Sequence, residues 1–313
     1  MKEYCFGVDI GGTTVKIGLF KTDGNLLEKW EIPTRKENNG YNILPDIAAA
    51  LKAKMEEKGL GLDDFVGVGL GVPGPVTDDG DVLTAVNLFW GYKEAAKEMK
   101  ALTGLKTKVG NDANVAALGE AWKGAGEGAS NMIMLTLGTG VGGGIVIDGK
   151  IVAGSHGAGG EIGHANINHE ETQACNCGNS GCLEQYASAT GITRLANQYL
   201  KKSDKPSSLR SAEEISSRAV FDAYKAGDGL AADIVEDFAE RLGGAMAVFA
   251  CVTDPQVLVI GGGVSNAGQP LIDVISKYYK KYTFQTCKAT PIVLATLGND
   301  AGIYGCAKMV IPS

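Results

Sequence analysis

The feature that most constrains the fold is a pattern that occurs twice: a strand, a turn rich in glycine and threonine, and a second strand. Residues 8–20 (VDIGGTTVKIGLF) align without gaps on residues 135–147 (LTLGTGVGGGIVI). The repeat is weak, because identities are few and small residues dominate. It nevertheless predicts two related α/β domains that flank a ligand-binding cleft.

The two turns expose several backbone N–H groups in one direction, which suits phosphate oxygens. A tight hairpin explains a single turn of this kind equally well. The second turn matches G-x-G-x-x-G at Gly138, Gly140 and Gly143, but it leads into another strand, whereas a dinucleotide fingerprint opens a helix. A third glycine run, 261–263, follows the apolar strand 257–260 and precedes a helix. Three such turns favour an ATP cleft, and no P-loop pattern occurs.

Composition narrows the class of protein further. The 313 residues are 44% hydrophobic and carry a net charge of −7 without a basic block, which argues against a nucleic-acid partner. No apolar run reaches the length of a membrane span, and the N-terminus lacks a signal pattern. The seven cysteines, an odd number, suit a reducing compartment. We therefore expect a cytoplasmic protein with no membrane contact.

Apolar periodicity predicts the secondary structure in outline. The first domain is expected to cover residues 1–115, joined by the C-terminal helix within 299–313, and the second to cover residues 116–298. The clearest elements are a helix at 43–58, a buried strand at 65–72, helices at 94–103 and from 112, a strand at 256–262, a helix after residue 270 and a last helix at 299–309.

Asn111 and Asp112 follow a strand and open a helix. Helix capping is the simplest interpretation, since Asn and Asp accept free N–H groups at a helix start. A second interpretation is catalytic, because side chains at the carboxyl ends of strands line the clefts of α/β proteins. A carboxylate beside an amide can orient and deprotonate an alcohol, so Asp112 is a candidate general base.

Three cysteines, Cys175, Cys177 and Cys182, lie close together in the segment 161–184, downstream of two histidines. Three thiolates and one imidazole form a closed tetrahedral zinc site, in which the metal is structural. From spacing alone, either His164 or His169 is a suitable fourth ligand. Glu161 and Glu184 bracket the segment in surroundings rich in glycine, where rigid carboxylates can accept hydrogen bonds from sugar hydroxyls.

Taken together, these motifs resemble the ROK family of sugar kinases and repressors over nearly the whole chain. The resemblance rests on Asp9-Ile-Gly-Gly-Thr-Thr-x-Lys16, Gly-x-Pro-Gly-Pro75, Asn111-Asp112-Ala-Asn114, Leu137-Gly-Thr-Gly-x-Gly-Gly143, Glu161-Ile-Gly-His164, Cys175-x-Cys-Gly-x-x-Gly-Cys-x-Glu184 and the glycine run at 261. It implies the actin-like, hexokinase-like (ribonuclease H-like) ATPase fold, with two α/β domains flanking a cleft.

The resemblance also implies roles for individual residues. Asp112 matches the catalytic base, and Asp9 matches the acid near Mg²⁺. Zinc ligands are implied at His164, Cys175, Cys177 and Cys182, which selects His164 over His169. Sugar-binding positions are implied at Asn87, Asn111, Asp112, Glu161, His164 and Glu184. ATP-binding positions are implied at Asp9, Gly11, Gly12, Thr13, Thr14, Lys16, Gly138, Thr139, Gly140, Gly142, Gly143, Gly261, Gly262 and Gly263.

The function implied by the resemblance is an ATP-dependent hexokinase with Mg²⁺ and structural Zn²⁺, most similar to bacterial glucokinases that make glucose 6-phosphate. The alternatives are a kinase for fructose, N-acetylglucosamine or N-acetylmannosamine, polyphosphate as the donor, and a non-catalytic sugar sensor. ROK repressors carry a helix-turn-helix before the first phosphate loop, and here that loop starts at residue 7, which favours a kinase. A homo-oligomer, dimer or tetramer, is expected from the resemblance alone.

Overall fold

The computed structural model describes residues 2–312, and the chain divides into two compact units. Unit 1 contains the residues up to 130, residues 144–160 and the residues from 296 on. Unit 2 contains residues 131–143 and 161–295. The domain bounds expected from the sequence stay a prediction.

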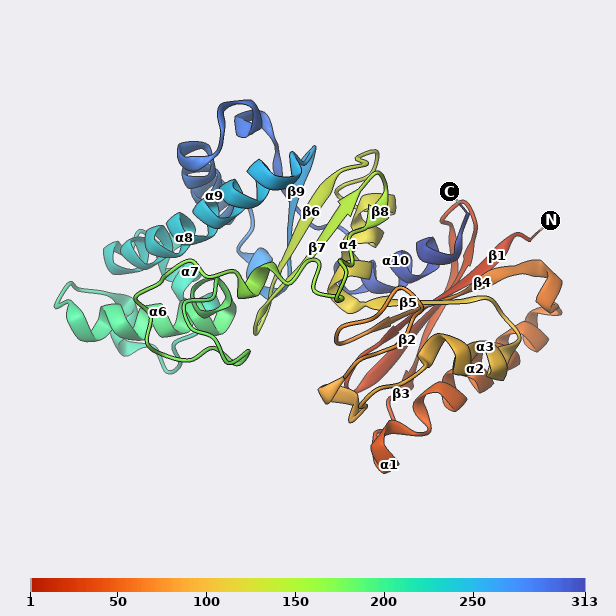
Figure 1. The fold of residues 1–313 in the computed structure, drawn as a ribbon. Coiled ribbons are helices and arrows are strands. Elements are labelled where there is room, and N and C mark those ends of the chain that lie inside the picture. Colours follow the sequence, from red (N-terminus) through yellow and green to blue (C-terminus); the bar gives the residue numbers. More distant parts are fainter. Residues whose placement is uncertain (1, 313) are drawn as a thin grey trace. The chain divides into compact units, whose positions relative to one another are not determined.

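Unit 1 is built on a five-stranded sheet with the strand order β3-β2-β1-β4-β5 (Figure 1). The first three strands form an antiparallel meander, and β4 and β5 run parallel to β1. This arrangement follows from the sequence, since tight turns join the first strands and a helix precedes each of the others. The strands are β1 (Tyr4–Ile10), β2 (Thr14–Lys21), β3 (Leu26–Pro33), β4 (Phe65–Val72) and β5 (Thr107–Asn111).

Helices cover both faces of this sheet. The helices of unit 1 are α1 (Glu37–Gly40), α2 (Ile43–Lys58), α3 (Ala95–Thr103), α4 (Asp112–Lys123) and α10 (Ala301–Val310). The expected helix at 43–58 and strand at 65–72 are confirmed to the residue. The last helix was expected from residue 299, but a short 3-10 turn, Gly298–Asp300, comes first and α10 begins at Ala301.

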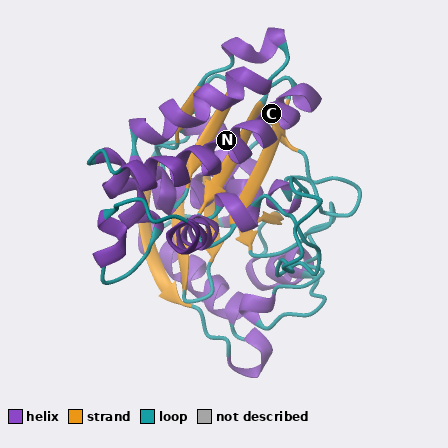
Figure 2. Ribbon diagram, turned by 90° about the vertical axis from the view of Figure 1, so that its left-hand side faces the viewer, coloured by secondary structure: helices purple, strands orange, loops and turns teal. Residues whose placement is uncertain are grey.

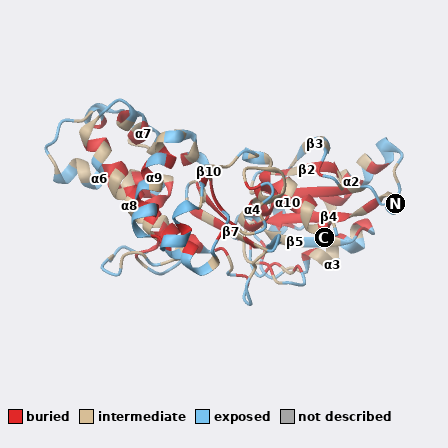
Figure 3. Cartoon of the chain, turned by 90° about the horizontal axis from the view of Figure 1, so that it is seen from above, coloured by how far each residue is buried: buried red, intermediate tan, exposed pale blue. Residues whose placement is uncertain are grey.

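Glycines alternate with larger apolar residues along β4, and this pattern sets how closely helices approach each face of the sheet. Val68 and Leu70 are fully buried in the core that contains α2, and Figure 3 shows the buried central strands in red. Gly69 points the other way, and a side chain there would overlap the backbone of Cys306 in α10. The glycines of FVGVGLGV therefore let α10 lie directly on the sheet.

The buried carboxylate of Glu120 in α4 fixes the chain that leads into α10. It accepts hydrogen bonds from the N–H groups of Ala125 (2.8 Å), Thr296 (3.1 Å) and Leu297 (2.8 Å). A buried charge is tolerated when several N–H donors satisfy it. This contact attaches the C-terminal segment to unit 1.

A second sheet has the strand order β10-β9-β6-β7-β8. β6, β9 and β10 are parallel, whereas β7 and β8 form an antiparallel hairpin. The hairpin confirms the expectation that the second glycine turn leads into a strand. The boundary of the units falls within β7. The strands are β6 (Met132–Leu137), β7 (Val141–Ile147), β8 (Lys150–Ile151), β9 (Val257–Gly261) and β10 (Ile292–Leu294).

Three helices of unit 2 begin at side-chain caps. Ser188, Ser216 and Asp228 accept backbone N–H groups at the starts of α6, α7 and α8. Figure 2 shows the helices that flank the strands in purple. They are α5 (Glu184–Ala187), α6 (Ala189–Lys202), α7 (Ser217–Lys225), α8 (Gly229–Thr253) and α9 (Gln269–Tyr282). None of the helices within residues 2–312 has the length and apolar character needed to span a bilayer.

Candidate functional site

The first glycine turn, at the junction of β1 and β2, is fixed by hydrogen bonds. The Gly11 N–H donates to the Thr14 carbonyl (3.0 Å), and Thr34 donates its hydroxyl to the Gly11 carbonyl (2.7 Å) and its N–H to the Thr13 carbonyl (2.9 Å). Carbonyl oxygens of the turn thus accept hydrogen bonds from the protein itself. Backbone N–H groups of such a turn suit an anion.

Asp9 lies at the end of β1 on the side of the sheet that faces α10. A side chain at Gly302 would collide with its carboxylate. Burial and the nearby charge of Asp112 raise the pKa of Asp9 to about 6, and Lys16 opposes this shift. Two carboxylates that repel each other at one edge of a sheet form an environment that a divalent cation would stabilise.

The sequence left two roles open for Asn111 and Asp112, helix capping and catalysis, and the structure shows which residue is the cap. Asn111 is the cap of α4: its Oδ1 accepts the Asn114 N–H (3.1 Å), and its Nδ2 donates to the Gly74 carbonyl (3.1 Å). Asp112 is the first helical residue, and its Oδ1 accepts the N–H of Ala113 (2.8 Å). The capping interpretation therefore belongs to Asn111, and Asp112 is held in the first turn of α4.

Asn87 lies beside the first glycine turn. A methyl group placed at Gly12 would lie 3.7 Å from the Cβ and from the carbonyl oxygen of Asn87. Unit 1 thus brings together Asp9, the glycine turn and Asn87. The candidate base, Asp112, is close enough to Asp9 for the two charges to interact.

The second glycine turn is attached to the start of α6 in unit 2. The Gly138 carbonyl accepts the Ala189 N–H (2.8 Å), and the Thr139 carbonyl accepts the Thr190 hydroxyl (2.8 Å). The turn is closed by a hydrogen bond from the Gly138 N–H to the Gly140 carbonyl (2.9 Å). As in the first turn, backbone carbonyl oxygens accept hydrogen bonds from other parts of the protein.

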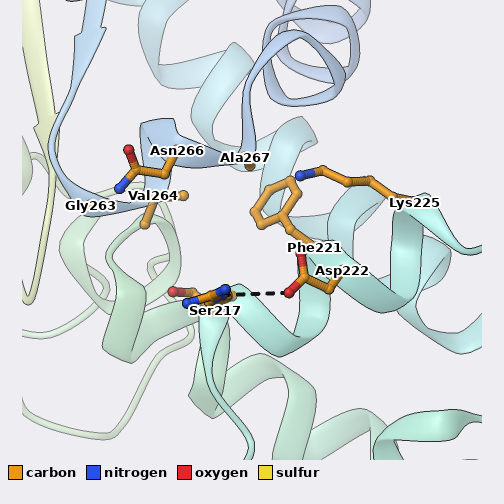
Figure 4. A pocket seen from close by; sticks show the side chains of 9 residues that line it. Ser217, Phe221, Asp222, Lys225, Gly263, Val264, Asn266 and Ala267 are labelled. Carbon is orange, nitrogen blue, oxygen red and sulfur yellow. Dashed lines mark ion pairs between the residues drawn. The ribbon is translucent and has the colours of Figure 1, made fainter.

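The third glycine run borders a pocket of about 360 Å³ in unit 2. Figure 4 shows the ring of Phe221 from α7 beside the 3-10 turn Gly263–Ala267. Arg218 and Asp222 of α7 form an ion pair (3.6 Å). The size suits a small ligand with both apolar and polar groups. Sequence reasoning identified the glycines but missed the side of the pocket formed by α7, because residues 217–225 match no motif.

Three thiols and one imidazole converge in the segment 161–184. The ligand atoms of His164, Cys175, Cys177 and Cys182 all lie within 4.8 Å of one another. Cys175 Sγ is 3.8 Å from His164 Nδ1, and Cys177 Sγ is 3.6 Å from Cys182 Sγ. Tetrahedral zinc with bonds of about 2.3 Å separates its sulfur ligands by about 3.8 Å, so these donors fit zinc. His169 is exposed and is not one of them.

The two candidate sugar-binding acids of unit 2 lie next to this thiol cluster. Glu184 Oε2 accepts the Val141 N–H (2.9 Å), and its Oε1 lies 3.8 Å from Cys175 Sγ. His164 has Nδ1 toward Cys175 and Nε2 4.0 Å from Glu161 Oε2. Glu184 is therefore held between the second glycine turn and the thiol cluster, while Glu161 is more exposed.

Comparison with known proteins identifies the family of this chain. The sequence model of the ROK family matches residues 5–312. The chain belongs to the ROK family. A glucokinase from Halalkalibacterium halodurans is 43% identical over 304 residues, which are 96% of this chain and 92% of that protein.

Two solved structures of the ROK family have the same fold. The ROK hexokinase from Thermus thermophilus superposes with a TM-score of 0.82 at 32% identity, covering 97% of each chain. A ROK glucokinase from Streptomyces griseus, solved in complex with glucose and AMPPNP, gives a TM-score of 0.75 at 32% identity over 98% of each chain. The expected actin-like, hexokinase-like fold is thereby confirmed.

Proposed function

We propose that this ROK protein is an ATP-dependent glucokinase that transfers the γ-phosphate of ATP to the 6-hydroxyl of glucose. The observation that carries the proposal is 43% identity to a glucokinase over nearly the full length of both chains. The glucose and AMPPNP complex of the Streptomyces griseus relative supports the same pair of substrates.

Asp112 is proposed as the general base. Its carboxylate accepts the proton of the sugar hydroxyl while the new O–P bond forms and the bond from the γ-phosphorus to ADP breaks. Phosphoryl transfer depends mainly on alignment and charge stabilisation, so the base chiefly orients the attacking oxygen. Asn111 supports this role, because its two hydrogen bonds fix the start of α4.

The proposed sugar-binding residues of unit 1 are Asn87, Asn111 and Asp112. Those of unit 2 are Glu161, His164 and Glu184. Amide and carboxylate groups at fixed positions are suited to hydroxyl recognition, since a missing hydroxyl leaves a buried partner unpaired. Hydrogen bonds to the backbone hold the side chains of Asn111 and Glu184 in defined positions, which supports this role.

The phosphates of ATP are proposed to bind to the N–H groups of the glycine turns, with the nucleoside in the pocket bordered by Phe221 and the run 261–263. Mg²⁺ would be held near Asp9, where its charge would offset the repulsion from Asp112 and neutralise developing charge on the phosphates. The raised pKa of Asp9 supports this position for a cation.

Zinc is proposed as a structural ion on His164, Cys175, Cys177 and Cys182. Four protein ligands leave no open position, so the metal fixes the loop and activates no water. His164 would then present its other nitrogen on the side of Glu161. Zinc-binding thiols must be reduced, which supports the proposed cytoplasmic location.

A homo-oligomer is also proposed, and light scattering on the purified chain tests it.

A panel of sugars in an assay of coupled ADP release tests the proposed function. With ATP and Mg²⁺, glucose should give the highest kcat/KM among glucose, fructose, N-acetylglucosamine and N-acetylmannosamine. Preference for an N-acetylated sugar would favour the alternative ROK kinases. Turnover with polyphosphate but not ATP would overturn the donor, and no turnover with any sugar would favour a sensor.

A further inference from the structure

Residues 82–93 of unit 1 form a small hairpin. Val82 and Lys93 exchange both backbone hydrogen bonds (2.9 Å each), and so do Ala85 and Trp90 (2.9 and 3.1 Å). The tip, residues 86–89, is a 3-10 turn followed by a residue in the left-handed conformation. The hairpin therefore presents its tip as a defined structure.

The side chains of residues 86–90 differ in burial. Leu88 and Trp90 are buried, and the Trp90 indole N–H donates to the Gly40 carbonyl (3.1 Å). Val86 and Phe89 are 78% and 60% exposed. The inward side chains pack the hairpin on unit 1, whereas the two large apolar side chains on the outside contribute little to that packing.

Phe89 also has an unfavourable backbone conformation. Its φ of 56° and ψ of 27° are left-handed, which a bulky aromatic residue rarely adopts and which glycine or asparagine adopts more easily. Strained residues of this kind cluster at functional sites. The aromatic side chain is thus costly to the backbone and contributes little to the hairpin's own core.

The tip adjoins the proposed active site within unit 1. Asn87, two residues before Phe89, lies beside the first glycine turn, since a methyl group added at Gly12 would lie 3.7 Å from its Cβ. Lys36 Nζ lies 5.8 Å from the centre of the Phe89 ring, within the range of a cation–π interaction. An exposed aromatic ring therefore lies close in sequence to a proposed sugar-binding residue.

We propose that Phe89 is a sugar-contact residue whose ring covers an apolar C–H face of the acceptor hexose, with Val86 beside it. This inference rests on the proposed function. Aromatic side chains provide large apolar contact areas with few rotatable bonds, and burying the sugar beneath one excludes water from the phosphate acceptor. The contact forms only when sugar is bound, which accounts for the exposure of the ring.

Steady-state kinetics of Phe89→Gly with glucose and ATP test the inference. The variant removes the ring and relieves the strained φ, so its melting temperature should equal or exceed that of the wild type. The KM for glucose should rise about tenfold, and the KM for ATP should stay unchanged. Phe89→Leu, which keeps apolar bulk, should show a smaller rise. Phe284→Ala removes an aromatic ring of similar exposure (64%) in unit 2 and should leave both constants unchanged.

An unchanged KM for glucose in Phe89→Gly would overturn the inference. A lower melting temperature with parallel rises in both KM values would also overturn it, because that result indicates a structural role. Failure of the proposed function is distinct, since the wild-type protein would then phosphorylate no glucose at all.

Discussion

At the scale of a residue, the carboxylate of Asp9, which we propose lies near Mg²⁺, lowers the stability of the fold at neutral pH. It lies against α10, where burial and Asp112 disfavour its charge and raise its pKa to about 6, from an ordinary value of 3.8. Between these two pH values the folded state keeps the proton that the unfolded state loses. The free energy of unfolding therefore falls as the pH rises through this window.

Replacing Asp9 by asparagine should remove this pH dependence. Near pH 4 the variant and the wild type should unfold at similar urea concentrations. Above pH 6 the variant should be the more stable by about 3 kcal/mol, because a pKa difference of about 2 units corresponds to that energy. Urea unfolding at pH 4.5 and pH 8 measures the difference. A stability gap that is the same at both pH values would refute the buried charge as its cause.

At the scale of elements, the packing of α10 on α4 sets how closely α10 lies in unit 1. The two helices approach so closely that a side chain at Gly305 would overlap the Val115 carbonyl of α4. Only glycine allows this contact, and the short distance lets α10 reach the sheet as well.

Gly305→Ala should lower the free energy of unfolding by about 3 kcal/mol, since the clash is with rigid backbone. Chemical denaturation monitored by circular dichroism gives the value. Gly91→Ala is the control, because Gly91 is exposed and nothing lies within 4 Å of its added methyl group. Equal stability of the two variants would show that α10 can shift without cost.

The proposed zinc site predicts that the segment 161–184 needs its metal. Cys177→Ser removes one proposed zinc ligand and should abolish zinc binding, lower the melting temperature and raise the KM for glucose more than the KM for ATP. Metal analysis and kinetics on the same preparation measure all three. Cys251→Ser, an exposed cysteine outside the cluster, should behave as the wild type. A zinc-free Cys177→Ser protein with the wild-type KM for glucose would separate the metal from sugar binding.

For the molecule as a whole, the sequence predicted what depends on local pattern. Apolar spacing predicted the helix at 43–58, and the buried-strand pattern FVGVGLGV predicted the strand at 65–72. It did not predict that Asn111 rather than Asp112 caps α4, because both residues cap well and the choice depends on a distant carbonyl, that of Gly74. The hairpin at 82–93 and the pocket side formed by α7 depend on long-range packing, which leaves no periodic signal.

The rate of glucose phosphorylation by Asp112→Asn tests the central claim most directly. The substitution keeps the shape of the side chain but removes its basicity. We expect kcat to fall by about 10²–10⁴-fold, while calorimetry shows glucose binding close to that of the wild type. Asp63→Asn, an exposed acid in the same unit, should have wild-type kcat. A kcat near the wild-type value in Asp112→Asn would contradict the assignment of Asp112 as the base for phosphoryl transfer.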